Sequence, residues 1–449
     1  MKQTIFLVSL MAYCTVRSLW EPVWAAFMYY GLAVLRPQAI WEWALPQGVR
    51  WSLYAALMAI AATLLNYQSL RPRVVQKAFM TVLLVFCGLL FGSYIVAMDH
   101  EIAGRQGWEY AKVLMMLIVG SYVIAQRWHF RYLGWVIFVC LTYLVYEVNF
   151  LYVFAGRLDI YHHGYGGLDN NGAGLMLAMV VPFCYHLFLA EQRWWRWGYV
   201  ACIIPTAHAV MLTYSRGAML SGIACGIGMV LTASRRRLRA VVAILVLGSI
   251  VLSLAGKEVQ ARFLTIRQEE QDASSQSRLD SWRAGLKIAA DYPIFGVGIR
   301  NSNLLTKQYG ADVQGRTIHN VYIQIMADSG FPAGAVYVLL IALSLKWLHV
   351  GARLSAGRLD EDVQARWHHH LCKATFWSLC TFAFGSLFLS LEHFELPYLL
   401  MLMGATAPGL SQESNQRSLL EAKGTLANSD QLHVRLGKAS RSQNKETAL

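Results

Sequence analysis

Apolar runs of about 20 residues recur along the whole chain, and this feature limits the possible folds more than any other. A run of that length can cross a lipid bilayer as one helix. Only 14% of the 449 residues are charged, whereas soluble domains carry about 25% charged residues. We therefore predict an all-α polytopic membrane protein. The same composition argues against a secreted disulfide scaffold, a disordered chain and a cytosolic enzyme.

The apolar runs predict a bundle of 11–13 spans, about 12 in all, because two of the runs are short. The runs cover 4–20, 22–36, 51–66, 78–98, 110–125, 133–155, 172–190, 198–213, 217–233, 239–255, 333–349, 371–390 and 397–409. Four regions follow: a transmembrane bundle over 1–255, a large outer loop containing helices over 256–332, transmembrane helices over 333–410, and a disordered cytoplasmic tail over 411–449.

The net charge of +13 has two interpretations, a nucleic-acid-binding surface or the basic cytoplasmic loops of a membrane protein. The basic residues are scattered over alternate short loops, which argues against nucleic acid. The opposite loops hold only Arg105, Arg157 and Arg216. By the positive-inside rule the basic loops are cytoplasmic, which places 256–320 on the outer side.

Two short polar segments on the predicted outer side could carry chemistry. Asp169 and Asn170 precede an apolar run and suit a helix N-cap, although a plain polar hairpin explains them equally well. Ser215 and Arg216 lie in a tight turn between two spans. Arginine at a membrane boundary is often an anchor. An arginine fixed in a turn also suits a phosphate, because its planar fork binds two oxygens.

The outer loop contains a predicted amphipathic helix over 277–290. Its apolar stripe has helical spacing and consists of Leu279, Trp282, Leu286 and Ala289. Arg278 and Arg283 lie near its start. Pro293 and the Gly296-Val-Gly298 segment end it in a close-packed turn, and Arg300 follows. A solvated surface helix is the simpler alternative for this segment.

His319 and Asn320 stand where the outer loop re-enters the membrane. Histidine is suited to proton transfer near neutral pH, so His319 is a candidate base. No outer loop contains an acidic metal-binding pair, and no nucleotide-binding phosphate loop is present. We therefore expect no metal and no cofactor.

Taken in order, these segments resemble the O-antigen ligase and polymerase superfamily of bacterial inner membranes over about 157–350. The similar elements are the segment before Pro182 with Asp169-Asn170-Asn171, then Ser215-Arg216-Gly217, then Arg278 to Gly298, then His319-Asn320, then Gly330 to Gly334. Pro22 and Arg36-Pro37 resemble the branch of probable O-glycosylation ligases associated with exosortase.

The resemblance implies a GT-C-like membrane glycosyltransferase, open laterally to membrane lipids. It would transfer a glycan from an undecaprenyl-diphosphate carrier on the periplasmic face of the inner membrane. The acceptor would be lipid A core, another glycan or a protein hydroxyl. Catalytic roles fall to His319 and Arg216. Substrate binding falls to Asp169, Asn170, Ser215, Arg278, Arg283, Arg300 and Asn320, with Arg278 or Arg300 completing the diphosphate site.

Two other functions fit parts of the sequence. A polymerase of the same superfamily would extend glycans on the lipid carrier, and the motifs do not separate it from a ligase. A flippase or transporter would fit a bundle of about 12 spans. Transporters commonly show repeat symmetry and ionisable residues at the membrane centre, whereas the candidates here gather at one surface.

Overall fold

The computed structural model describes residues 2–46, 48–70, 74–156, 159–232, 269–313, 315–360 and 362–412. Their regular structure is helical, apart from one isolated bridge between Tyr165 and Leu168. The predicted all-α class is confirmed for this part of the chain. The predicted span over 239–255, the tail from 413 onward and the basic residues of 235–239 lie outside the described residues.

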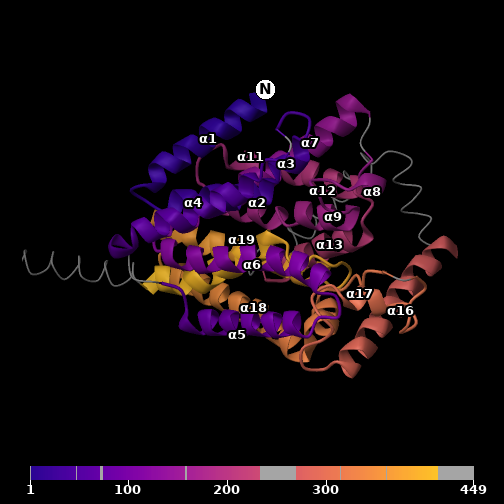
Figure 1. Ribbon diagram of the computed structural model, residues 1–449. Coiled ribbons are helices and arrows are strands. Elements are labelled where there is room, and N and C mark those ends of the chain that lie inside the picture. Colours follow the sequence, from indigo (N-terminus) through magenta and orange to yellow (C-terminus); the bar gives the residue numbers. More distant parts are fainter. Residues whose placement is uncertain are drawn as a thin grey trace, which may run out of the picture.

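The first half of the chain folds into helices that follow the predicted apolar runs (Figure 1). They are α1 (Lys2–Ser18), α2 (Val23–Leu35), α3 (Pro37–Ile40), α4 (Trp51–Leu65), α5 (Lys77–Ile95), α6 (His100–Val123) and α7 (Arg127–Phe150), with a 3-10 turn at Tyr67–Ser69 and a π-turn at Leu151–Ala155. Asp99 caps α6 by accepting hydrogen bonds from the Glu101 and Ile102 amides.

Shorter helices alternate with long ones in the second half. They are α8 (Ile160–His163), α9 (Asn170–Ala178), α10 (Val181–Ala190), α11 (Arg196–Ala201), α12 (Ile203–Leu212), α13 (Arg216–Thr232), α16 (Glu269–Asp291), α17 (Ser302–Leu305), α18 (Val321–Ala356) and α19 (Val363–Gly385). A last helix begins at 395. The described part therefore keeps helical structure both within the apolar runs and in the predicted outer loop.

Four helical stretches in the described part are long and apolar enough to cross a membrane. They are Lys77–Ile95, Arg127–Phe154, Asn170–Ala190 and Val321–Ala356. Two shorter apolar helices, Trp51–Leu65 and Arg216–Thr232, accompany them. These stretches are what an integral membrane protein needs. The expected total of about 12 spans stays a prediction.

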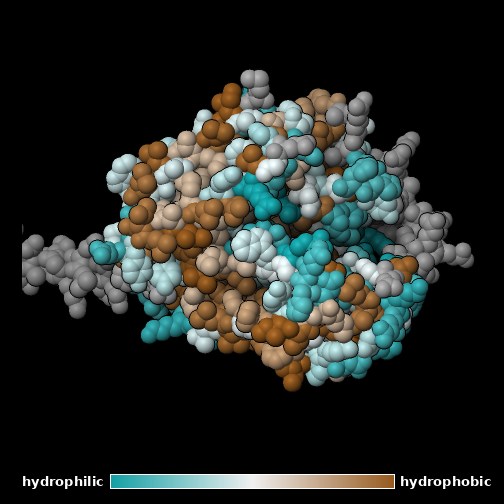
Figure 2. Space-filling view, in the orientation of Figure 1, coloured by the Kyte–Doolittle hydropathy of each residue, from teal (hydrophilic) through white to brown (hydrophobic). Residues whose placement is uncertain are grey.

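Helix α19 is the centre of the bundle, since it packs against α7, α10, α13 and α18. At one end of the bundle, Arg127 forms an ion pair with Asp362 at 3.3 Å, and Arg366 Nε donates to the Ala190 carbonyl at 3.0 Å. These residues come from loops predicted to share the cytoplasmic side. The outer-loop segments meet at the other end, around α8, α16 and α17, where hydrophilic residues gather (Figure 2).

The predicted helix over 277–290 is present within α16, but only part of its predicted apolar stripe is buried: Ala289 is buried and Trp282 half-buried. Leu279 and Leu286 are exposed, whereas Ser281, Ala284 and Ile288 are fully buried. Helix α16 packs on α18 through this face of small residues. The close packing of α16 on α18 thus decides which face is buried, and it leaves the two larger leucines exposed.

The predicted apolar run over 333–349 lies within α18, which begins at Val321 and is broken by a kink at Gly330 shortly before that run. Gly330 has a left-handed φ of 87°. A Cβ there would lie 2.2 Å from the Ile294 carbonyl oxygen. The Phe331 amide, freed by the kink, donates to the Pro293 carbonyl at 2.9 Å. This hydrogen bond therefore connects the turn at Pro293 to the kink at Gly330 and stabilises both.

Candidate active site

The two short polar segments singled out in the sequence are in contact. Asp169 is the N-cap of α9, as predicted. Asn170 Nδ2 donates to the Thr213 carbonyl at 3.3 Å, and Ser215 Oγ donates to Asn171 Oδ1 at 2.9 Å. The asparagines therefore join the start of α9 to the turn before α13.

That turn fixes the position of Arg216, the first residue of α13. The preceding Tyr214 has a left-handed φ of 53°. A Cβ on Gly174 of α9 would lie 2.6 Å from Thr213 Oγ1 and 2.8 Å from Ala218 Cβ. Glycine is thus needed for α9 to approach the turn. Arg216 is exposed, with its backbone held in this packed turn.

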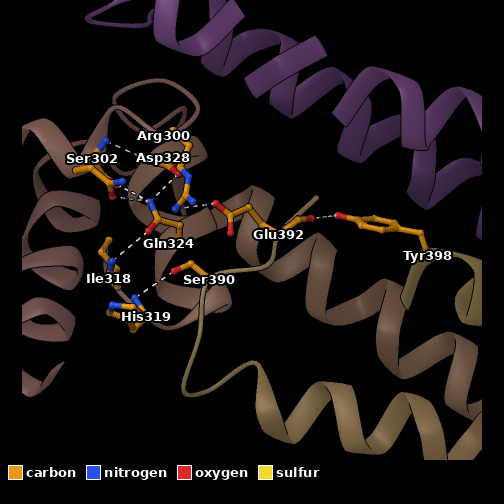
Figure 3. Close-up of polar contacts among 10 residues, drawn as sticks. Arg300, Ser302, Ile318, His319, Gln324, Asp328, Ser390, Glu392 and Tyr398 are labelled. Atoms are coloured by element: carbon orange, nitrogen blue, oxygen red, sulfur yellow. Dashed lines mark hydrogen bonds and ion pairs between the residues drawn. The ribbon is translucent and has the colours of Figure 1, made fainter. Parts of the chain in front are cut away.

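The turn after α16 is close-packed, as its glycines predict. A Cβ on Gly296 would lie 2.3 Å from the Asp328 backbone carbon. The Asp328 carboxylate accepts from the Ser302 amide at 3.1 Å and from Gln324 Nε2 at 2.8 Å (Figure 3). These buried hydrogen bonds attach the turn to α18. Arg300 lies in the chain between Gly296 and Ser302, so both contacts help to fix its position.

Arg300 pairs with Glu392 at 3.2 Å across this network (Figure 3). The Glu392 side chain is only 2% exposed. Its negative charge raises the pKa of Arg300, against the opposing effect of burial. Glu392 was not predicted as a site residue from the sequence. Its signal is the pair of glutamates, Glu392 and Glu395, in a short segment between two apolar runs on the predicted outer side.

His319 lies at the start of α18 with a left-handed φ of 55°. Its amide donates to Ser390 Oγ at 3.1 Å, while Asn320 caps α18 through bonds from two following amides. Partial burial lowers the pKa of His319, and the positive charge of Arg278 lowers it further. The negative charge of Asp169 raises the pKa of His319 and so opposes these two effects. The imidazole is therefore biased toward the neutral form that can accept a proton.

Arg278 and Arg216 lie near one another, and the negative charge of Asp169 opposes the effect of Arg216 on Arg278 without forming an ion pair. Burial lowers the pKa of Arg278, and the charge of Arg216 is the next cause. No carboxylate in the described part of the chain comes within ion-pair distance of either guanidinium. Arg283 differs: it is 66% exposed and pairs with Asp280 at 3.1 Å. The structure thus places Arg278 toward the site and Arg283 on the solvent side of α16.

A cavity of about 500 Å³ brings Asp169, Arg300 and His319 together. It is the polar hollow beside α3, α6 and α9 in Figure 2. Among its other charged or titratable residues, Arg36 was named in the sequence only as part of a family resemblance, and Glu109, His393 and Glu395 carry no sequence signal of a site. They come from three distant parts of the chain, so no local pattern marks them as a group.

Four non-glycine residues in the described ranges have left-handed backbone, namely Arg36, Tyr214, Arg300 and His319. Three of them line the cavity, and Tyr214 precedes Ser215. This conformation is costly for residues with a side chain and gathers at functional sites. Within the same ranges, no three His, Cys, Asp or Glu side chains converge as metal ligands would.

Comparison with known protein families gives a match for the middle of the chain. Residues 201–338 match the family model described as O-Antigen ligase. This match supports the resemblance of the chain to the O-antigen ligase and polymerase superfamily. With its apolar helices, the family supports a membrane enzyme of ligase or polymerase type that resembles a glycosyltransferase.

The O-antigen ligase segment contains Arg216, Arg278, Arg300 and His319. Residues 1–167 match a family of unknown function. A search of curated proteins found no match. The cavity therefore combines residues of both matched segments with Leu168, Asp169 and the stretch from Ser390 to Glu395, which lie outside them.

Proposed function

We propose that the chain transfers a glycan from undecaprenyl diphosphate to an acceptor hydroxyl on the periplasmic face of the bacterial inner membrane. One observation carries the proposal. Arg278 lies close enough to both Arg216 and His319 for their charges to interact, neither arginine has an ion-pair partner in the described part of the chain, and all three residues belong to the O-antigen ligase segment. Such a cluster suits a diphosphate leaving group and a hydroxyl that must lose a proton.

The step that these residues would catalyse is a displacement at the anomeric carbon of the donor sugar. The acceptor oxygen forms the new bond to that carbon, and the bond from the carbon to the diphosphate oxygen breaks. Undecaprenyl diphosphate leaves with the bonding electron pair, held by Arg216 and Arg278 through charged hydrogen bonds. The acceptor proton passes to His319.

The remaining predicted residues serve the site in different ways. Asn170 and Ser215 connect α9 to the turn that carries Arg216, and Asn320 caps the helix after His319. Arg300 already has a carboxylate partner in Glu392. The balance of charge therefore favours Arg278 over Arg300 as the second diphosphate ligand, and Arg283 stays outside the proposed site.

The test uses full-length protein in lipid nanodiscs, an undecaprenyl-diphosphate-linked glycan and membrane extract as the acceptor source. His319→Ala is expected to abolish transfer, because it removes the proton acceptor. His162→Ala is the matched control, since this exposed histidine pairs with Asp159 away from the cavity. Equal transfer by wild type and His319→Ala protein contradicts the proposal.

The products separate a ligase from a polymerase. Glycan attached to lipid A core or to protein indicates a ligase, whereas longer chains on undecaprenyl diphosphate indicate a polymerase. Both products require the same diphosphate site and base. Movement of the lipid-linked glycan across vesicles without transfer indicates a flippase and overturns the enzymatic proposal.

A further inference from the structure

The cavity beside His319 has a wall that the proposed transfer step does not use. This wall consists of Arg36 between α2 and α3, Gln106 and Glu109 on α6, His393 before the last helix and Glu395 at its first position. Neither Arg216 nor Arg278 lines the cavity. His319 lines it and is also influenced by Arg278. His319 is therefore close both to Arg278 and to this wall.

Arg36 is held in place with unused hydrogen-bonding capacity. Its backbone has a left-handed φ of 52°, and its amide donates to the Leu32 carbonyl at 2.9 Å. The buried Nη1 atom has no hydrogen-bond partner in the described part of the chain. Its Cζ lies close to Gly167, which also lines the cavity. A buried donor without a partner is costly, so a ligand would satisfy it.

The charges on this cavity differ from those at Arg216 and Arg278. Two arginines, Arg36 and Arg300, face three carboxylates, Asp169, Glu109 and Glu395. Carboxylates repel a phosphate, so the lining does not favour an anion. A sugar hydroxyl both donates and accepts, and it can satisfy a carboxylate and a guanidinium at once. The cavity volume also lies in the range of small-ligand sites.

We propose that this cavity binds a neutral sugar of the acceptor, with Arg36, Glu109 and Glu395 as the residues that select it. The proposal rests on the proposed function, since His319 is the base that this sugar hydroxyl would meet. It also gives the N-terminal family of unknown function a role, because Arg36 and Glu109 lie within that matched segment. Glu109 pairs with Lys112 at 2.6 Å, which orients its carboxylate.

The test measures two ligands on the same full-length protein in nanodiscs. Saturation-transfer NMR reports binding of the methyl glycosides of glucose, galactose, mannose and N-acetylglucosamine. Calorimetry reports binding of inorganic pyrophosphate. The variants are Arg36→Gln, Glu109→Gln and Glu395→Gln, and Glu101→Gln is the matched control, an exposed glutamate of α6 outside the cavity.

At least one glycoside is expected to bind, about tenfold more weakly in the three cavity variants, which is the loss of one charged hydrogen bond. Pyrophosphate affinity is expected to stay unchanged, which also shows that the variants are folded. The proposal is overturned if no glycoside binds, if the cavity variants bind glycosides as wild type does, or if they lose pyrophosphate binding. Unchanged pyrophosphate affinity in Arg216→Gln and Arg278→Gln instead counts against the proposed function.

Discussion

Arg278 and Arg300 both lie in the predicted outer loop, yet the charges around them differ. Arg300 has the buried Glu392 at 3.2 Å, and this partner raises its pKa. The main charge near Arg278 is another arginine, Arg216, and its pKa is lowered. Arg300 therefore has a carboxylate in an ion pair, whereas Arg278 and Arg216 have none in the described part of the chain and only the more distant Asp169 acts on Arg278.

This difference suggests a structural role for the Arg300–Glu392 pair and a ligand-binding role for Arg216 and Arg278. A buried ion pair contributes to a defined local structure, and removing one partner leaves an unpaired charge. Two neighbouring like charges are unfavourable unless a counter-charge arrives. In the described part of the chain, Arg216 and Arg278 obtain no such counter-charge from an ion pair. We infer that an anionic ligand supplies it.

The largest expected effect follows from removing Arg278 or Arg216. Arg278→Gln and Arg216→Gln are each expected to lower the transfer rate by about 10²–10³-fold, because the charge on the leaving group loses a donor. The measurement is transfer by reconstituted protein. Arg283→Gln, on the same helix as Arg278 but exposed, is expected to change the rate by less than about twofold. Equal losses at Arg278 and Arg283 contradict the comparison.

Breaking the ion pair between Arg300 and Glu392 should lower the stability of the folded protein. Glu392→Ala leaves Arg300 without its carboxylate, which costs about 3–5 kcal/mol for a buried pair. Thermal unfolding of the purified protein checks this as a lowered Tm. The double variant Arg300→Met with Glu392→Leu removes both charges and is expected to recover much of the loss. A double variant no more stable than Glu392→Ala argues against a structural role for the pair.

The turn that carries Arg300 offers a smaller effect on stability. Gly296→Ala places a Cβ against the Asp328 backbone at a φ of 65°, so we expect a loss above about 1 kcal/mol. Gly310→Ala is the matched control, since Gly310 also has a positive φ but open space around it. Equal Tm losses in the two variants indicate that backbone conformation, and not the contact with α18, determines stability at Gly296.

The smallest effect concerns pH. Arg278 lowers the pKa of His319, because its positive charge disfavours the protonated imidazole. Arg278→Gln should therefore raise the His319 pKa and move the acid limb of the pH–rate profile to higher pH. The residual activity of the variant gives the profile, and Arg283→Gln should leave the limb in place. A shift to lower pH contradicts a positive charge beside His319.

The sequence predicted local structure better than the arrangement of the site. The cap at Asp169 and the close turn at Gly296 were predictable, because both depend on neighbouring residues. The buried face of α16 was not, because contact with α18 selects Ser281 and Ala284 over the leucines. Glu392 was missed because its partner Arg300 is distant in sequence.

The candidate site residues themselves remain predictions, although their grouping has a physical explanation. Asp169, Arg300 and His319 reach one cavity because three separate turns meet at one end of the bundle. Arg36, Glu109 and Glu395 join them only through the packing of helices. Sequence reasoning identified each residue by its immediate surroundings, and no such signal exists for a wall assembled from three distant segments.

The left-handed backbone at Arg36, Tyr214, Arg300 and His319 implies a trade-off between stability and function. Glycine at any of these positions would relieve the local conformational cost. At three of them it would also remove a charged or titratable side chain from the cavity. Tyr214 is the exception, since it shapes the turn without lining the cavity. Stabilised versions of this enzyme are therefore best sought at Tyr214 and away from the other three positions.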